Sequence, residues 1–207
     1  SWLDLETADL TIMGKTYYIL DTNAPATNTS LTLLDSAEDT ILAEGETATV
    51  AGHEVSINFI DSDEVILTID GVNTNSLNEG ETQKIATETY VGVKDILLGS
   101  RDTDVGKVEL SIGKGKMVHT DEEDVEINDE DLEGLSVEIT AAVDLAGLTL
   151  VWDTDEDSFV TPDSSLTIPG FETVKLSFTG MVYPANEELL LENNGDENIV
   201  LNDFPLK

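Results

Sequence analysis

The residues with the clearest capacity for chemistry are carboxylates gathered in one short segment. Asp153, Asp155 and Asp157 stand at alternate positions, and Asp163 follows a few residues later. Hard cations such as Ca²⁺ take roughly six to eight oxygen ligands, and alternating aspartates can direct several carboxylates at one ion. We therefore expect these four residues to be candidate ligands for Ca²⁺ or another divalent cation.

The same segment does not match an EF-hand. Ser158 and Ser164 stand where that motif requires glycine and glutamate, and the segment follows an expected strand that ends at Trp152 rather than a helix. Two interpretations stay open, a calcium loop of another kind or an acidic turn exposed to water.

Patterns typical of enzymes are weak throughout the chain. There is no cysteine, and the only two histidines, His53 and His119, lie far apart in sequence. The segment from Gly113 to Lys116 lacks the spacing of a phosphate-binding loop and is read as a hairpin turn. A pair of carboxylates for glycoside hydrolysis is the remaining catalytic alternative, but aromatic residues that line sugar clefts are few. We expect that the protein is not an enzyme.

One modification site is predicted. Asn28, Thr29 and Ser30 form an acceptor sequence for N-glycosylation in a loop rich in Thr and Asn. We expect Asn28 to carry a glycan at the protein surface.

Net charge is the strongest signal in the composition. The chain has 44 Asp and Glu residues against 9 Lys and Arg, which gives a net charge of -35. Nucleic acids and anionic membrane surfaces are bound by clustered Lys and Arg, so both are excluded as partners. No apolar run approaches the roughly 20 residues needed to cross a bilayer, so we expect no membrane insertion. The compact state repels itself, and we expect salt or bound cations to offset that repulsion.

The elements that must position these residues are strands. Hydrophobic residues make up 40% of the chain, which argues against disorder, and they alternate with polar residues in several runs. These runs span residues 55–59, 65–69, 108–112, 148–152 and 174–178. Turn signals such as Asp70-Gly71 and Pro169-Gly170 separate them. The pattern predicts an all-β fold of antiparallel, sandwich-like sheets, with a short helical turn as the alternative over residues 132–143.

The distribution of charge predicts two tandem Ig-like domains. Residues 1–118 carry a net charge of -14, whereas residues 119–207 carry -21 on a shorter stretch. The sequence at residues 42–47 recurs in similar form at 77–82, and each copy contains Glu-Gly-Glu-Thr. This echo indicates either a duplicated hairpin in the first domain or a turn that is common in acidic proteins.

Six features of the chain, taken in order, carry a family resemblance. They are residues 14–20, the two Glu-Gly-Glu-Thr hairpins, and residues 90–97, 106–115, 125–128 and 168–176. Over roughly residues 8–185 the chain resembles the surface-layer (S-layer) proteins of methanogenic archaea and of small symbiotic archaeal lineages. The resemblance implies a cell-envelope lattice protein of tandem β-sandwich domains that is glycosylated and dependent on cations. It transfers no catalytic residue. The chain is shorter than a full S-layer protein, without a leader or an anchor, and we expect a mature protein or an excised piece.

These observations predict a structural, extracellular protein of the cell surface or envelope. We expect it to assemble with copies of itself, with cations assisting the contacts. The alternative is an adhesion or carbohydrate-binding module that binds surface glycans in a cleft near Trp152. A third interpretation is a domain that is acidic only because its surroundings are salty.

Overall fold

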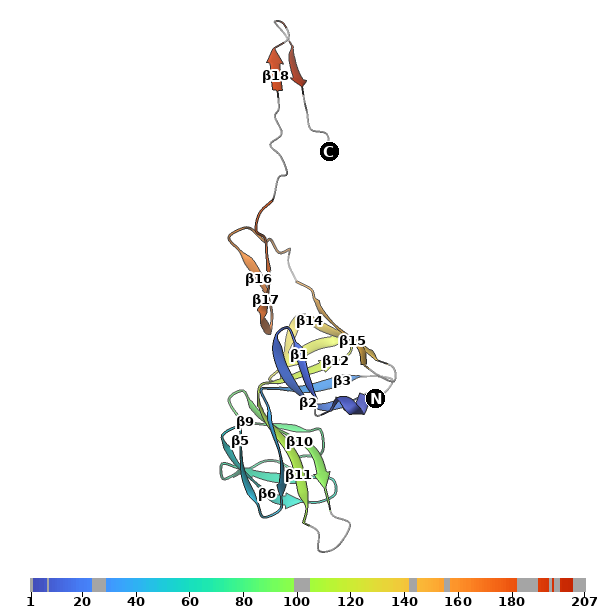
Figure 1. Cartoon of the computed structure of the whole chain (residues 1–207), viewed down its shortest axis with the longest axis vertical. Coiled ribbons are helices and arrows are strands. Elements are labelled where there is room, and N and C mark those ends of the chain that lie inside the picture. The colour runs from blue at the N-terminus through green and yellow to red at the C-terminus, as the bar shows by residue number, and fades with distance from the viewer. Residues whose placement is uncertain are drawn as a thin grey trace. The chain divides into compact units, whose positions relative to one another are not determined.

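The protein is built from β-strands. The structure is a computed structural model of the whole chain, and it describes residues 2–6, 8–23, 29–98, 105–141, 145–154, 157–181, 190–193, 195 and 198–202 (Figure 1). Strands in these ranges form five sheets, and the one helical element among them is the 3-10 helix η1 (Trp2–Leu5). The predicted all-β fold class is confirmed.

A seven-stranded antiparallel sheet forms the framework. Its strands follow the order β1-β2-β3-β12-β13-β14-β15. They are β1 (Asp9–Ile12), β2 (Lys15–Asn23), β3 (Ser30–Asp35), β12 (Lys116–Thr120), β13 (Glu123–Ile127), β14 (Glu130–Ala141) and β15 (Leu145–Trp152). Apolar side chains from all seven strands pack into one cluster. The seven strands therefore share one core on one face of the sheet.

Residues 38–114 form a second body between β3 and β12, here called the inserted sandwich. Its two four-stranded sheets have the orders β4-β11-β10-β9 and β5-β6-β7-β8. The strands are β4 (Glu38–Ala43), β5 (Thr47–Val50), β6 (His53–Ile60), β7 (Val65–Ile69), β8 (Val72–Asn73), β9 (Thr82–Ala86), β10 (Thr89–Leu97) and β11 (Lys107–Lys114). Buried Val, Leu and Ile side chains from both sheets share one core.

The chain enters and leaves the inserted sandwich at adjacent points. Strands β3 and β12 pair directly, with Leu34 opposite Lys116. One step further, the Asp35 backbone N–H donates a 3.0 Å hydrogen bond to the Gly115 carbonyl. The seven-stranded sheet is therefore continuous across the insertion.

The predicted domain boundary between residues 118 and 119 is not a boundary of the structure, because it falls inside β12. The chain divides instead into unit 1, which contains Ser1–Ser158 and Thr167–Lys175, and unit 2, which contains Phe159–Leu166 and Leu176–Lys207. Strands β12 to β15 complete the sheet that β1 to β3 begin, so the core of that sheet takes residues from both sides of the predicted boundary.

Strand β2 is buried on both of its faces. Four consecutive residues, 17–20, have almost no exposed surface. Tyr17 and Ile19 pack into the core of the seven-stranded sheet. Tyr18 and Leu20 point to the opposite face and pack with Tyr90 of the inserted sandwich. This second, smaller core joins the two bodies of unit 1.

The alternating runs mostly face inward as predicted. Val65, Leu67 and Ile69 in β7 are buried, and so is every apolar side chain of residues 108–112 in β11. In β6 a bulge between Ile57 and Phe59 shifts the alternation, so that Phe59 is 43% exposed. The helical alternative over residues 132–143 is wrong for the described residues there, because β14 continues to Ala141.

Two further sheets have only two strands each. Strands β16 (Ser165–Ile168) and β17 (Phe171–Ser177) form one, and β18 (Leu190–Asn193) and β19 (Ile199–Asn202) form the other. At the tip of the first hairpin, Ile168 and Phe171 pack on the core of the seven-stranded sheet within unit 1. The outer ends of β16 and β17 belong to unit 2.

Candidate functional site

The predicted metal ligands are exposed. Asp153, Asp157 and Asp163 all face solvent, and Asp155 lies outside the described residues. Within the described part of the chain, no three His, Asp or Glu side chains are grouped so that they could hold a metal ion. The structure therefore does not bring the three described aspartates together, and a calcium loop here remains a prediction.

The predicted glycosylation site also falls beyond what the structure describes. Asn28 lies outside the described residues, whereas Thr29 and Ser30 of the same acceptor sequence lie within them. The Thr29 carbonyl accepts a 2.9 Å hydrogen bond from the Asp121 backbone N–H. The end of the acceptor sequence is thus fixed to the turn that follows β12.

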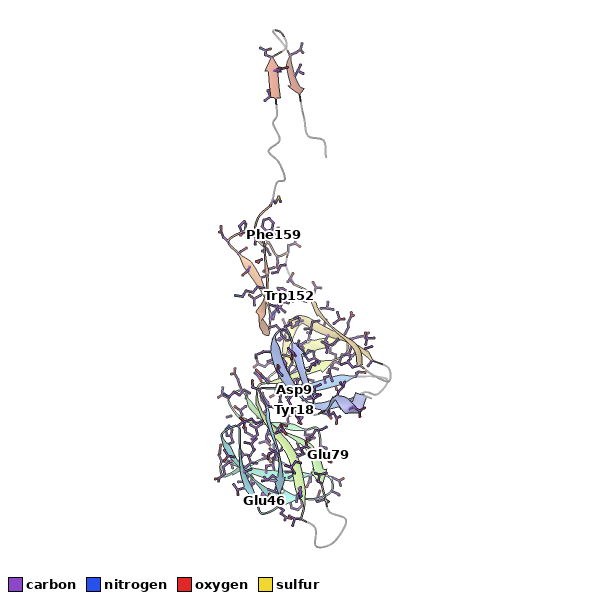
Figure 2. All side chains as sticks on the ribbon, in the orientation of Figure 1. Asp9, Tyr18, Glu46, Glu79, Trp152 and Phe159 are labelled. Atoms are coloured by element: carbon purple, nitrogen blue, oxygen red, sulfur yellow. The ribbon has the colours of Figure 1, made fainter. Side chains whose placement is uncertain are left out.

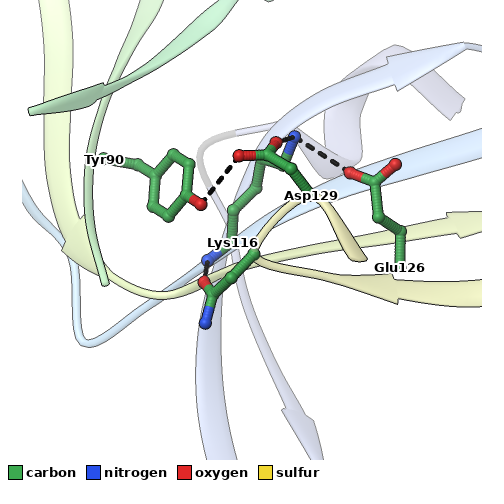
Figure 3. Close-up of polar contacts among 5 residues, drawn as sticks. Tyr90, Lys116, Glu126 and Asp129 are labelled. Atoms are coloured by element: carbon green, nitrogen blue, oxygen red, sulfur yellow. Dashed lines mark hydrogen bonds and ion pairs between the residues drawn. The ribbon is translucent and has the colours of Figure 1, made fainter. Parts of the chain in front are cut away.

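A polar cluster joins the inserted sandwich to the seven-stranded sheet (Figure 3). The Tyr90 hydroxyl donates a 2.8 Å hydrogen bond to the Asp129 carboxylate. The Lys116 ammonium pairs with that same carboxylate and, at 3.0 Å, with Glu126. Side chains from β10, from β12 and from the β13–β14 hairpin therefore meet at one point.

The sequence of the β13–β14 turn explains the position of Asp129. Asn128 and Asp129 have φ angles of 55° and 70°, the left-handed conformation that two-residue hairpins require and that Asn and Asp tolerate best. The Asn128 side-chain oxygen accepts a 3.0 Å hydrogen bond from the backbone N–H of Lys116. The backbone N–H of Asn128 donates a 2.9 Å hydrogen bond to the Lys116 carbonyl. The turn is thereby locked against β12.

The electrostatics of this cluster favour its charged groups. The hydrogen bond from Lys116 lowers the pKa of Asp129. Burial acts to lower the pKa of Lys116, but its hydrogen bonds to Asp129 and Glu126 outweigh burial and leave that pKa raised. Burial of the ring, together with the Asp129 carboxylate, raises the pKa of Tyr90 to about 12. The Tyr90 phenol is therefore a hydrogen-bond donor near neutral pH.

A cavity of about 260 Å³ lies beside this cluster, here called the junction cavity. Its apolar floor includes Tyr17 and Met117, each only 3% exposed. Three of the nine basic residues of the chain line it, namely Lys15, Lys114 and Lys116. The acidic residues of its lining are Asp35 and Glu88. Lys15 and Lys116 already pair with carboxylates, so Lys114 is the lysine of this lining that has no ion pair among the described residues.

The two histidines differ completely in environment. His53 begins β6 directly after the β5–β6 turn, with Nδ1 2.7 Å from the Asp70 carboxylate, and this hydrogen bond lowers the pKa of Asp70. His119 is fully buried in β12, its Nδ1 has no hydrogen-bond partner among the described residues, and its Nε2 lies 2.9 Å from the Met117 sulfur. Burial lowers the pKa of His119 to about 4, so its ring is neutral at pH 7.

Unit 2 has large hydrophobic side chains but no core. Phe159 is 81% exposed, Met181 71% and Leu176 60%, and Phe178 and Leu191 are also exposed (Figure 2). Among the residues of unit 2 whose exposure the structure describes, none is buried. The alternation over 174–178 correctly indicates a strand, but its apolar face at Leu176 is uncovered.

Trp152, where the sequence places a ligand cleft as an alternative, is partly buried. Its side chain packs against the core of the seven-stranded sheet at the end of β15. This packing gives Trp152 a role in stability.

Comparison of the chain with protein-family models, with curated proteins and with solved structures gave no match. In the part of the chain that the structure describes, no helix has the length and apolar character needed to span a membrane.

Proposed function

We propose that the chain is a structural subunit of an extracellular surface layer or coat and that it assembles with copies of itself. One observation carries this proposal. Unit 2 exposes five large hydrophobic side chains and has no buried side chain among its described residues. A surface of this kind on a folded protein typically marks a contact with another macromolecule.

Energetics supports an assembly contact in unit 2. A two-stranded sheet is at best marginally stable in water on its own, and neither hairpin pairs with a third strand among the described residues. Covering a side chain such as Phe159 or Leu176 contributes about 1.5–3 kcal/mol. A neighbouring copy that covers these side chains would therefore supply the core that unit 2 lacks.

The net charge of -35 gives cations a role in this assembly. Copies with this charge repel one another at low ionic strength. Salt at about 0.1 M limits such repulsion to distances near 10 Å. We infer that cations act mainly by screening, with the exposed aspartates of residues 153–163 as the first place for bound Ca²⁺.

The cell-surface location rests on the resemblance to S-layer proteins and on the acceptor sequence at Asn28. Both fit an exposed, acidic, all-β chain without cysteine. Labelling of intact source cells with an antibody against the chain tests this location, and labelling only after the cells are broken open would contradict it.

The assembly is tested by light scattering and electron microscopy of the purified chain, with and without Ca²⁺. The wild type is expected to form ordered polymers when cations are added. The double variant Phe159→Ser/Met181→Ser should remain monomeric. Val72→Ser is the matched control, because Val72 is 71% exposed like Met181 but lies on β8 of the inserted sandwich.

Two results would contradict the proposal in different ways. A wild type that stays monomeric at every cation concentration would overturn self-assembly and favour the alternative of a monomeric carbohydrate-binding module. Equal assembly of the wild type and the double variant would overturn the role of unit 2 as the contact.

A further inference from the structure

We propose that the junction cavity is a carboxylate-binding site that accepts acidic side chains from a second copy of this chain. The inference rests on the proposed self-assembly and names one of its contacts. The distribution of basic residues is the first observation. Of nine in the whole sequence, three line this cavity. Lys84 lies close by, with its ammonium 5.7 Å from the centre of the Tyr90 ring.

The three lysines of the cavity are not equally available. Lys116 is only 12% exposed and is held by Glu126 and Asp129. Lys15 is 54% exposed and pairs with Asp35 at 2.7 Å. Lys114 is exposed at the end of β11 and forms no ion pair within the described ranges. An incoming carboxylate would therefore bind Lys114 first.

The cavity exists because two glycines stand in its wall. Gly170 has φ +70°, and a Cβ built there would lie 2.5 Å from the Ile127 Cδ1. Gly115 has φ +94°, a conformation that residues with side chains rarely adopt. Any other residue at these positions would fill or distort the space. The buried Tyr17 and Met117 side chains below it lower the local dielectric constant, which strengthens an ion pair formed at the rim.

Charge complementarity identifies a second copy as the occupant. The chain has 44 carboxylate side chains, and the exposed Asp153, Asp157 and Asp163 form no ion pair with any described residue. The net charge of -35 makes two copies repel each other, and a site lined by lysines is one place where opposite charges can meet. Such a pair also sets the register of the contact, because like charges oppose other arrangements.

The test compares two lysines on one strand. Lys114→Glu and Lys107→Glu change the net charge equally, and both residues are exposed at opposite ends of β11. Lys114→Glu should raise the concentration required for assembly about tenfold relative to Lys107→Glu. Equal thermal unfolding of the two variants would exclude misfolding as the cause. Equal assembly of the two variants would overturn the proposal.

A second measurement separates this inference from the proposed function. Hexaglutamate is titrated calorimetrically into the monomeric chain at low cation concentration. Binding by the wild type and by Lys107→Glu, with at least tenfold weaker binding by Lys114→Glu, would support the site even if the wild type never polymerised. If hexaglutamate does not bind, or binds both variants equally, the carboxylate site is refuted, whether or not the chain assembles through unit 2.

Discussion

The Tyr90 hydroxyl donates a 2.8 Å hydrogen bond to the Asp129 carboxylate. Tyr90 comes from β10 of the inserted sandwich, and Asp129 comes from the β13–β14 turn of the seven-stranded sheet. The Tyr90 ring is 1% exposed, and Lys116 holds the same carboxylate from the other side. This bond therefore fixes the inserted sandwich to the sheet that carries it.

Tyr90→Phe is expected to lower the free energy of unfolding by about 1.5 kcal/mol, because the lost hydrogen bond has a charged acceptor. A double-mutant cycle with Asp129→Asn, measured by chemical denaturation, isolates the pair and should give a coupling energy of about 1 kcal/mol. Strictly additive effects would show that the two groups do not interact in solution.

Gly92→Ala is expected to destabilise the protein by about 1–3 kcal/mol through overpacking. A Cβ at this position would lie 2.4 Å from the Cδ2 of Leu20, which is fully buried and cannot move aside. Gly147→Ala is the control, since its Cβ would meet nothing closer than 3.9 Å. Addition of Leu20→Ala to Gly92→Ala should recover part of the loss, and similar unfolding midpoints for the two glycine variants would contradict the packing.

The buried His119 predicts a dependence of stability on acid. Burial lowers its folded-state pKa to about 4, whereas the unfolded chain titrates near the ordinary value of 6.5. Between these two pKa values the His119 ring is protonated in the unfolded state and neutral in the folded state. The free energy of unfolding therefore decreases as the pH falls from about 6.5 to about 4. The difference corresponds to about 3 kcal/mol.

The variant His119→Leu isolates this effect, because the carboxylates of the chain titrate equally in both proteins. The free energy of unfolding of the wild type, relative to the variant, should fall as the pH is lowered from 7 to 4. Parallel curves over that range would mean that the His119 ring is accessible to protons in the folded state.

Removal of divalent cations with EDTA at low salt is expected to lower the melting temperature by about 5 °C, because the net charge of -35 is then unscreened. KCl at matched ionic strength should restore most of the loss, since the described residues contain no cluster that would bind a metal. Recovery with Ca²⁺ alone would instead indicate defined sites. An unchanged melting temperature would show that divalent cations do not stabilise the folded protein.

Much of the strand pattern can be predicted from the sequence, because period-two alternation reports burial on one face. Residues 65–69 show this most clearly. The insertion cannot be predicted in this way, since host and insert share the same period. One local signal was present, the continuous apolar run at residues 17–20, which needs partners on both faces of its strand.

The two Glu-Gly-Glu-Thr segments repeat their geometry as well as their sequence. Glu46 and Glu81 each bond through both backbone N–H and carboxylate to the residue three positions earlier, at 3.0–3.3 Å. The preceding glycines, Gly45 and Gly80, both have φ near +80°. Each segment leads into a hairpin, and the two hairpins lie in different sheets of the inserted sandwich. Both interpretations of the repeat, a duplicated hairpin and a common turn, account for this shared geometry.

The candidate site was beyond prediction for a physical reason. Lys15 and Lys114 are far apart in sequence, and only the pairing of β3 with β2 and β12 brings them to one cavity. The carboxylates of residues 153–163 suggest a metal site because they are neighbours in sequence. Closeness along the chain does not by itself bring their side chains together around one ion. Likewise, alternation identifies the apolar face of β17 but does not say what covers it.

The adjacent entry and exit of the inserted sandwich have a mechanical consequence. When tension along the chain reaches β3 and β12, it opens the ladder between them from the end at Ser30 and Thr120. The inserted sandwich follows the last pair of this ladder, Leu34 and Lys116. It therefore bears no tension until the hydrogen bonds between β3 and β12 have broken. The inserted sandwich would therefore stay folded while the seven-stranded sheet unfolds. Its own unfolding would come later and would then lengthen the chain further.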